Sequence, residues 1–378
     1  MTAAIAPPRD DAERCDWLRL IRSANVGPIG FLQLLARFGS AARALERLPD
    51  LAARGGRRQP RICSRGEAKR ELAAVRAFGA DWLALGEPAY PAALAATADP
   101  PPLIAVKGDR GLLGRPILAI VGARNASASG RRFSRDIAHE LGAAGYVIVS
   151  GLARGIDAAA HAGALAHGTV GVAAGGIDIA YPPQHAELQA EIGAHGALVG
   201  EVRLGTRPQA RHFPRRNRLV SGLARGVLVV EAALKSGSLI TARYAAEQGR
   251  EVLAVPGSPR DPRARGCNDL IRNGAVLVES ADDVLRALAF GARAAPEPAA
   301  PEPAFEPAAH EEPEAGDSVQ AQDAVRELLS PTPVEVDELV RQSQLTPSVV
   351  LTILLELELA GRLARHPGNR VSLPASSP

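Results

Sequence analysis

Apolar residues follow two different patterns along this chain of 378 residues. Before about residue 95 they recur at the three- and four-residue spacing that is typical of amphipathic helices. This spacing predicts small helices over Cys15–Ser23, Ile29–Phe38, Ala41–Arg47 and Glu67–Phe78. The stretch Val26-Gly27-Pro28-Ile29-Gly30 is a tight turn that opens the second of these helices.

From Pro102 to Ser280, short aliphatic runs alternate with helical segments. The runs do not alternate with polar residues, as expected for strands that are buried on both faces. They predict strands over Leu103–Lys107, Ile117–Gly122, Tyr146–Gly151, Thr169–Gly175, Ala197–Glu201, Gly226–Glu231, Glu251–Gly257 and Ala275–Glu279. Helices are expected over Arg131–Ala143, Ile156–Ala166, Pro183–Ile192, Leu239–Glu247 and Asp282–Phe290. Such repeated strand–helix units predict an α/β fold with a doubly wound, mostly parallel sheet, which binds ligands beyond the carboxyl ends of its strands.

The pattern changes again after residue 293. The stretch Ala294–Gly316 is rich in Pro, Ala and Glu and is predicted to be an extended linker. Three helices follow, over Val319–Leu329, Val334–Gln342 and Thr346–Glu358, and Gly361–Leu373 then predicts two short strands. This is a winged-helix-like pattern. We therefore expect four parts: a helical domain (1–95), a sheet domain (96–292), the linker (293–318) and the winged-helix-like domain (319–374).

The third helix of the winged-helix-like domain carries two glutamates, Glu356 and Glu358, and no basic residue. A helix that enters a DNA groove needs Arg, Lys, Asn or Gln to read base edges. The sequence therefore favours a protein-contact role for this domain, or none. The helix–glycine turn–helix near Gly27 is open to two interpretations, a module that holds a nucleic-acid backbone or only a pair of packed helices.

The charge and the cysteine content limit the class of protein to which this chain can belong. Only three of the 44 basic residues are lysines, so a lone arginine means little in this chain and only clusters count. Three scattered cysteines argue against a disulfide framework or a thiolate metal site, and they suit a reducing cytoplasm. No signal peptide or membrane span is predicted, so no membrane partner is expected. Neither GxGxxG nor a P-loop occurs, and no cofactor is expected.

One cluster stands out. Six arginines and no acid fall between Val202 and Arg218. Uncompensated like charges repel, so their usual partner is a polyanion. We interpret His212–Val220 as a phosphate-binding loop, in which Phe213 stacks on a base, Arg215 and Arg218 hold phosphates, Asn217 holds the loop and Arg216 points to water. The alternative is a solvated surface loop.

Two further candidates follow predicted strands. Gly122 permits a sharp turn that would project Arg124 from the sheet edge, and Ser127 or Ser129 would cap the next helix. In the stretch from Ser150 to His161, Gly151 and Gly155 bracket Arg154. Asp157 and His161 would then lie on one helix face. They would form either an acid–base pair or a hydrogen bond that fixes the loop, and the second is favoured.

Two glycine- and serine-rich turns complete the set. Gly175-Gly176 precedes Asp178, which could orient neighbouring arginines. Ser236 and Ser238 begin a helix after the strand that ends at Glu231, and they would supply backbone amides to a phosphate or simply cap the helix. Glu231 is the best candidate if the chain is a hydrolase.

These motifs, in this order, resemble the DNA-processing protein family DprA, also called Smf. The resemblance runs from Tyr90-Pro91 to Asp283 and includes IVGAR, SGLARGIDAAAH, GGIDIAYP, FPRRNR, VVEA, SGSLITA and GCNDLIRNGA. It implies an extended Rossmann core that binds single-stranded DNA, protects DNA taken up in natural transformation and helps to load RecA recombinase. By resemblance, DNA contacts fall on Arg124, on the loop Ser150–Gly155 and on Phe213 to Arg218. A homodimer contact falls around Asn268–Leu277, with Leu270 and Ile271 as apolar contacts.

The sequence departs from the family pattern at two places. Gly200-Glu201 stands where the family has Ser-Glu, and Pro183 stands where relatives often carry a basic residue. We expect a single-stranded DNA-binding protein that is not an enzyme. The alternatives are a hydrolase of nucleotides or nucleoside phosphates, with Glu231 acting, and a nucleotide-sensing module on the same scaffold.

Overall fold

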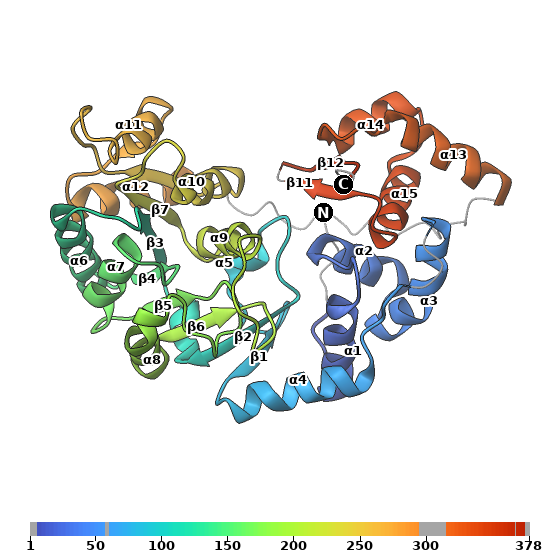
Figure 1. The fold of residues 1–378 in the computed structure, drawn as a ribbon, viewed down its shortest axis with the longest axis horizontal. Coiled ribbons are helices and arrows are strands. Elements are labelled where there is room, and N and C mark those ends of the chain that lie inside the picture. The colour runs from blue at the N-terminus through green and yellow to red at the C-terminus, as the bar shows by residue number, and fades with distance from the viewer. Residues whose placement is uncertain (1–5, 57–59, 295–314, 367, 375–378) are drawn as a thin grey trace. The chain divides into compact units, whose positions relative to one another are not determined.

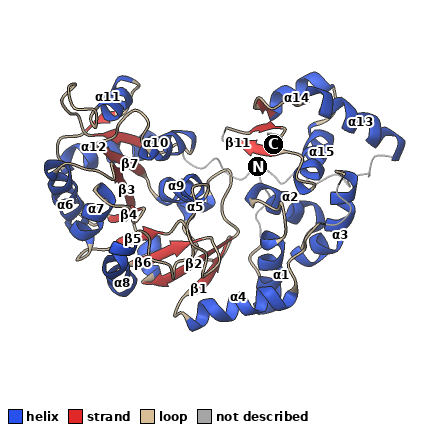
Figure 2. Cartoon of the chain, in the orientation of Figure 1, coloured by secondary structure: helices blue, strands red, loops and turns tan. Residues whose placement is uncertain are grey.

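The structure is a computed structural model that describes residues 6–56, 60–294, 315–366 and 368–374. These residues form two compact units (Figure 1). One unit joins residues 9–68 with the described C-terminal residues, and the other consists of residues 6–8 and 69–294 and contains the large sheet. Strands concentrate in the second unit, and helices dominate the first (Figure 2).

The large sheet has nine strands in the order β1-β2-β6-β5-β4-β3-β7-β8-β9. The strands β3 to β9 pair in parallel, whereas β1 and β2 are antiparallel to their neighbours. Their bounds are β1 Asp81–Ala84, β2 Leu103–Gly108, β3 Ile117–Gly122, β4 Val147–Ser150, β5 Thr169–Val172, β6 Ala197–Gly200, β7 Gly226–Val230, β8 Glu251–Ala254 and β9 Val276–Leu277. The predicted mostly parallel, doubly wound sheet is confirmed, and the eight predicted strands are all present.

Helices cover both faces of this sheet (Figure 1). On one face lie α6 (Ala128–Ala143), α7 (Ile156–Ala164), α8 (Ala186–His195) and α12 (Ala281–Ala294). On the other lie α5 (Ala92–Ala95), α9 (His212–Leu223) and α10 (Gly237–Glu247). The short elements η1 (Arg110–Gly114), η2 (Pro183–His185) and α11 (Arg265–Arg272) complete the unit. Between the layers the core is aliphatic, and Leu118, Ile120 and Ile148 are fully buried.

Some elements of this unit were not predicted: the short α5 and η1, strand β1 and helix α9. Strand β1 is a four-residue edge strand, and it belongs to the sheet unit, which includes the residues from Lys69 onward. Helix α9 occupies the stretch that we predicted to be a loop.

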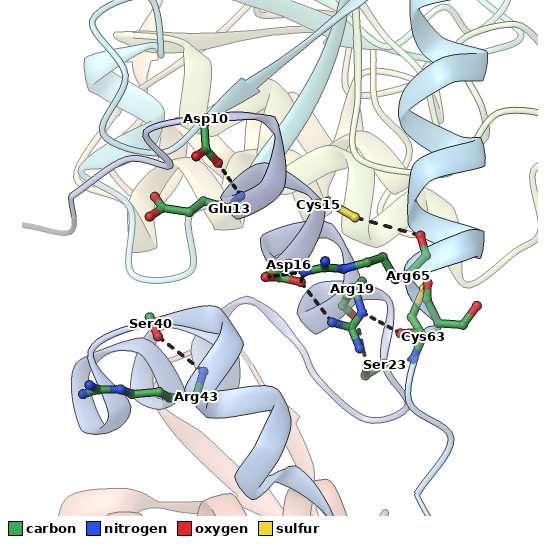
Figure 3. A network of polar contacts seen from close by, with 11 residues as sticks. Asp10, Glu13, Cys15, Asp16, Arg19, Ser23, Ser40, Arg43, Cys63 and Arg65 are labelled. Carbon is green, nitrogen blue, oxygen red and sulfur yellow. Dashed lines mark hydrogen bonds and ion pairs between the residues drawn. The ribbon is translucent and has the colours of Figure 1, made fainter.

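The N-terminal helices are α1 (Asp11–Arg22), α2 (Pro28–Phe38), α3 (Ala41–Arg54) and α4 (Arg65–Ala77), which continues into the sheet unit. Asp10 caps α1 by accepting from the Glu13 amide (2.8 Å), and Ser40 caps α3 (Figure 3). Asp16 accepts from Arg19 (2.9 Å) and pairs with Arg65 (3.4 Å), which ties α1 to the start of α4 (Figure 3).

The C-terminal domain has the predicted winged-helix pattern. Its elements are α13 (Ala315–Leu328), β10 (Val334–Glu335), α14 (Val336–Ser343), α15 (Pro347–Leu359), β11 (Ala364–His366) and β12 (Arg370–Ser372). The strands pair in the order β10-β12-β11. Most of the predicted linker lies outside the described residues. None of the described helices is both long and apolar enough to cross a membrane.

Candidate nucleic-acid interface

The order of the strands reverses between β3 and β7. From β3 the chain winds outward to β4, β5 and β6, and it then returns to β7 on the opposite side of β3. In open α/β sheets, ligands bind beyond the carboxyl ends of the strands at such a reversal. Gly122 ends β3 and Val230 ends β7, so the turn after Gly122 lies at this point. The amide of Ala123 donates to the Glu231 carbonyl (2.8 Å) and holds the turn there.

The loop between β4 and α7 lies directly on the turn after β3. Gly155 has a φ of 80°, and a β-carbon on it would be 2.2 Å from the carbonyl oxygen of Ala123. Only glycine accommodates both this conformation and this approach. The contact brings Arg154 beside Arg124, as expected from two adjacent strand ends.

Together the two turns form a basic pocket of about 490 Å³. Its walls are Arg124, Asn125, Arg131, Arg135, Arg154, Gly155, Ala158, Ala159 and His185. Arg131 and Arg135 are one turn apart on α6, so both project on the same side of that helix. All four arginines are exposed, and no acidic side chain among the described residues forms an ion pair with any of them. The pocket therefore carries a concentrated, uncompensated positive charge.

Two aromatic rings adjoin this charge. The Arg124 guanidinium lies 5.0 Å from the centroid of the Phe213 ring, within the range of a cation–π contact. The Tyr181 ring packs on Phe213 with 5.6 Å between the centroids, and Tyr181 is 44% exposed. A basic pocket that meets exposed ring edges suits a ligand with both phosphates and flat bases.

The prediction of a loop at His212–Val220 is wrong, because these residues lie in helix α9. Arg215 remains exposed, with its Nε 3.8 Å from a Glu201 carboxylate oxygen. Arg216 is only 6% exposed, so the expectation that it points to water is also wrong. Its guanidinium lies against Gly151 and donates to the Val172 carbonyl (3.3 Å), which supports the β4–α7 loop from beneath.

Arg218 is a structural residue in this fold. Its side chain is 6% exposed, and it forms ion pairs with Glu201 and with Asp99, the latter at 3.5 Å. Burial alone would lower the pKa of Arg218, but the Glu201 and Asp99 carboxylates outweigh burial and raise it. Arg218 thus fastens α9 to the rest of the unit. The expected phosphate contact at this position is not supported, because the guanidinium is already paired and covered.

Asp157 and His161 do not bond to each other. The Asp157 carboxylate accepts from the amides of Gly151 (3.2 Å) and Ala153 (3.3 Å), so it fixes the β4–α7 loop without His161. His161 is fully buried, and its Nδ1 lies 2.7 Å from the Thr169 hydroxyl. Burial, aided by the charge of Arg216, lowers the pKa of His161 to about 3. Both the favoured Asp–His hydrogen bond and the acid–base pair are therefore wrong.

Several residues of the predicted site form hydrogen bonds with other residues of the protein. Ser127 caps α6, as expected, and its hydroxyl and amide both bond to the Glu231 carboxylate. Ser150 is buried and donates to the Ile120 carbonyl (2.6 Å). Asp178 accepts from the Gly205 amide rather than orienting an arginine.

Ser236 and Ser238, in the turn after β7, begin helix α10. Ser236 caps this helix, and its hydroxyl lies 2.7 Å from that of Ser238. Asn217 donates to the Gly237 carbonyl (3.2 Å), so it holds α9 against this turn. Ser236 therefore caps the helix, which was one of the two interpretations of these serines.

Sequence reasoning missed Arg131, Arg135, His185, Asn125 and Tyr181. The missing signal was helix phase: we predicted that the helix begins at Arg131, whereas α6 begins three residues earlier at Ala128. With the true start, Arg131 and Arg135 fall in the first two turns, beside the turn after β3. Tyr181 lies in a motif that was singled out for its glycines and for Asp178.

At the far edge of the sheet unit, Leu270 and Ile271 lie on α11 and are partly buried. Leu277 on β9 is 45% exposed. The homodimer contact predicted for this region stays a prediction. The described residues contain no cluster of three or more His, Cys, Asp or Glu side chains that could hold a metal ion.

Comparison with known proteins covers all three domains. The family described as DNA recombination-mediator protein A matches residues 81–289. The DprA-like N-terminal HHH domain matches residues 11–74, and the DprA winged helix domain matches residues 292–369. The chain is 44% identical over 296 residues to Protein Smf of Escherichia coli, covering 75% of each protein. It is 46% identical over 223 residues to DNA processing protein DprA of Bacillus subtilis, covering 58% of this chain and 75% of that protein.

Solved structures agree with the sequence comparisons. DNA processing protein A of Streptococcus pneumoniae is similar with a TM-score of 0.57 and 36% identity, covering 68% of this chain and 86% of that one. DNA processing protein A of Helicobacter pylori, described for its single-stranded DNA binding mode, has a TM-score of 0.51 and 31% identity, covering 55% and 96%. The ordered motifs, the sheet topology and these matches establish that the chain belongs to the DNA-processing protein family DprA, also called Smf.

Proposed function

We propose that this protein binds single-stranded DNA at the basic pocket between β3 and β4. The observation that carries the proposal is the group of four exposed arginines without acidic partners, next to the rings of Phe213 and Tyr181. Arg124, Arg131, Arg135 and Arg154 would hold phosphates. The Helicobacter pylori relative, described for its single-stranded DNA binding mode, supports this assignment.

The geometry favours a single strand over a duplex. Base stacking on an aromatic ring needs an unstacked base, which only a single strand offers freely. Arginines that contact phosphates carry no sequence information directly, so sequence preference should be slight. Of the contacts expected from the sequence, Arg124, Arg154, Gly155, Phe213 and Arg215 remain part of this proposal. Gly122, Gly151, Ser127 and Ser150 serve it indirectly, because they shape the turns that carry the arginines. Asn217 holds α9, which carries Phe213, against the turn before α10.

We assign this binding to recombination, where the protein protects incoming single-stranded DNA in the cytoplasm and helps to load RecA recombinase during natural transformation. The family description as a recombination mediator supports this role. A homodimer formed through Leu270 and Ile271 would present two such pockets. We propose a binding role rather than catalysis, since Glu231, the candidate for a hydrolase, is engaged by the hydroxyl and amide of Ser127.

The test is a comparison of single- and double-stranded oligonucleotides by fluorescence anisotropy across a salt series. If about four to six phosphates are neutralised, log K against log salt should have a slope of roughly −3 to −4 for single strands. A slope near zero, or equal affinity for duplex and single strand, would contradict the proposal. RecA loading is measured separately as filament formation on strands covered by single-strand-binding protein, so a failure there leaves the DNA-binding assignment standing.

A further inference from the structure

Helix α15 of the winged-helix domain is buried on two sides. One side packs into the domain's own core through Val350, Ile353, Leu354 and Leu357. Leu355 and Leu359 are also buried, at 3% and 1% exposure, although neither belongs to that core. The cover over this second side comes from the N-terminal helices, which lie in the same compact unit.

The contact is close at three places. A β-carbon placed on Gly30 would lie 3.6 Å from Leu355 Cδ1. The Asn25 side chain donates to the Leu359 carbonyl (3.0 Å), which lies in the last turn of α15. A β-carbon placed on Gly55 would lie 2.0 Å from the Glu356 carbonyl oxygen, so only glycine permits the observed approach.

Charges across this contact are complementary. Glu356 is 4% exposed and lies 3.8 Å from Arg54 of α3, while Gln322 of its own domain donates to it (2.7 Å). Burial raises the pKa of Glu356, against the opposing effects of Gln322 and Arg54. Glu358 accepts from Arg365 (2.7 Å), and Arg365 also donates to Gln33 of α2 (3.4 Å). The two glutamates that do not suit a DNA groove therefore have polar partners in the unit that includes the N-terminal helices.

The glycine turn before α2 lies beneath the same helix. The Glu358 carboxylate is 3.7 Å from the β-carbon position of Gly27 and 3.8 Å from that of Gly30. The side chains of α15 therefore cover this turn, and while α15 lies here the turn is not free to contact a nucleic-acid backbone.

We propose that α15 is a docking helix whose partner is the N-terminal helical domain of the same chain. The buried leucines, the close approach at Gly55 and the pairing of Arg54 with Glu356 identify this partner. In the docked state α15 is unavailable to a DNA groove, and the turn at Gly27 is unavailable to a phosphate backbone. This role does not depend on the basic pocket of the sheet unit.

The test uses the complete chain with a protease site inserted between residues 303 and 304 and an affinity tag at the N-terminus. After cleavage, the C-terminal fragment should stay bound to the tagged fragment. Gly55→Ala should weaken this retention at least about fivefold, because overpacking a close contact is destabilising. Gly55 has a φ of −71°, so alanine fits its own backbone and the clash falls on α15. Gly114→Ala is the matched control, since a β-carbon there meets nothing within 4 Å.

A second measurement needs no cleavage. In the intact chain, Gly55→Ala should raise amide hydrogen exchange in residues 24–31 and 351–360, whereas Gly114→Ala should leave both segments protected. Circular dichroism checks that each variant keeps its helices. Release of the fragment from the wild-type chain after cleavage would overturn the proposal. So would equal retention and equal exchange in Gly55→Ala and wild type.

Discussion

The guanidinium of Arg124 lies over the ring of Phe213, with 5.0 Å between Cζ and the ring centroid. Arg124 follows strand β3 and Phe213 lies in the first turn of α9, 89 positions later in the chain. The contact joins the charged wall of the pocket to its aromatic edge. A base that stacks beside this pair would place its own phosphate near Arg124, which gives charge and ring separable contributions to binding.

The charge contribution can be tested at α6. The double variant Arg131→Ala/Arg135→Ala should weaken binding to all single-stranded sequences alike and reduce the salt slope by about 1.4, at about 0.7 per lost phosphate contact. Fluorescence anisotropy at several salt concentrations measures both effects. Arg132→Ala is the control, because Arg132 lies on the same helix and does not line the pocket. An unchanged salt slope in the double variant would show that Arg131 and Arg135 of α6 do not contact the DNA.

The ring contribution should behave differently. Phe213→Ala should lose about 1–3 kcal/mol of binding free energy, roughly 5- to 150-fold in affinity, through lost base stacking. The salt slope should stay the same, since no phosphate contact is removed. Phe213→Tyr keeps a ring and should bind nearly as well as the wild type. If Phe213→Ala instead changed only the salt slope, the ring would serve to position Arg124 and not to hold a base.

Arg218 and Arg215 provide a contrasting pair on one helix, because both lie near Glu201. Arg218→Ala leaves the Glu201 and Asp99 carboxylates partly buried and should lower the free energy of unfolding by about 3 kcal/mol or more. Arg215→Ala removes an exposed and longer ion pair and should cost less than about 1 kcal/mol. Urea unfolding measures the stabilities. DNA affinity should fall for Arg215→Ala and stay unchanged for folded Arg218→Ala. The reverse result would show that Arg218 contacts a phosphate.

The sequence predicted the sheet well because its central strands are buried on both faces. Ile117–Gly122 is β3 to the residue, since a continuous apolar run has no other stable place in such a fold. Edge strand β1 was missed because a four-residue run at Asp81 has too short a pattern, and its formation depends on pairing with the distant β2.

The site could be predicted only in part. Arg124, Arg154 and Phe213 follow from their positions after strands or in a basic cluster. The burial of Arg216 and Arg218 could not be predicted, because it depends on groups contributed by distant segments: Val172 on β5, Glu201 after β6 and Asp99 before β2. Charged residues in the first half of α9 also conceal its buried apolar positions, Leu219, Val220 and Leu223, which lie in its second half.

The fully buried His161 should make the stability of the sheet unit depend on pH in a defined window. Its pKa is lowered to about 3 by burial, whereas an unfolded histidine titrates near 6.5. The unfolded state therefore binds the proton more readily. The contribution of neutral His161 is fully present above pH ~6.5 and is lost as pH falls toward 3, at up to about 1.4 kcal/mol per pH unit. His161→Gln removes this titration, so in urea unfolding the stability difference between wild type and variant should stay constant from pH 7.5 to about pH 6.5 and then shrink as the pH falls to 4.5. Parallel curves across that range would show that His161 is not held neutral in the folded protein.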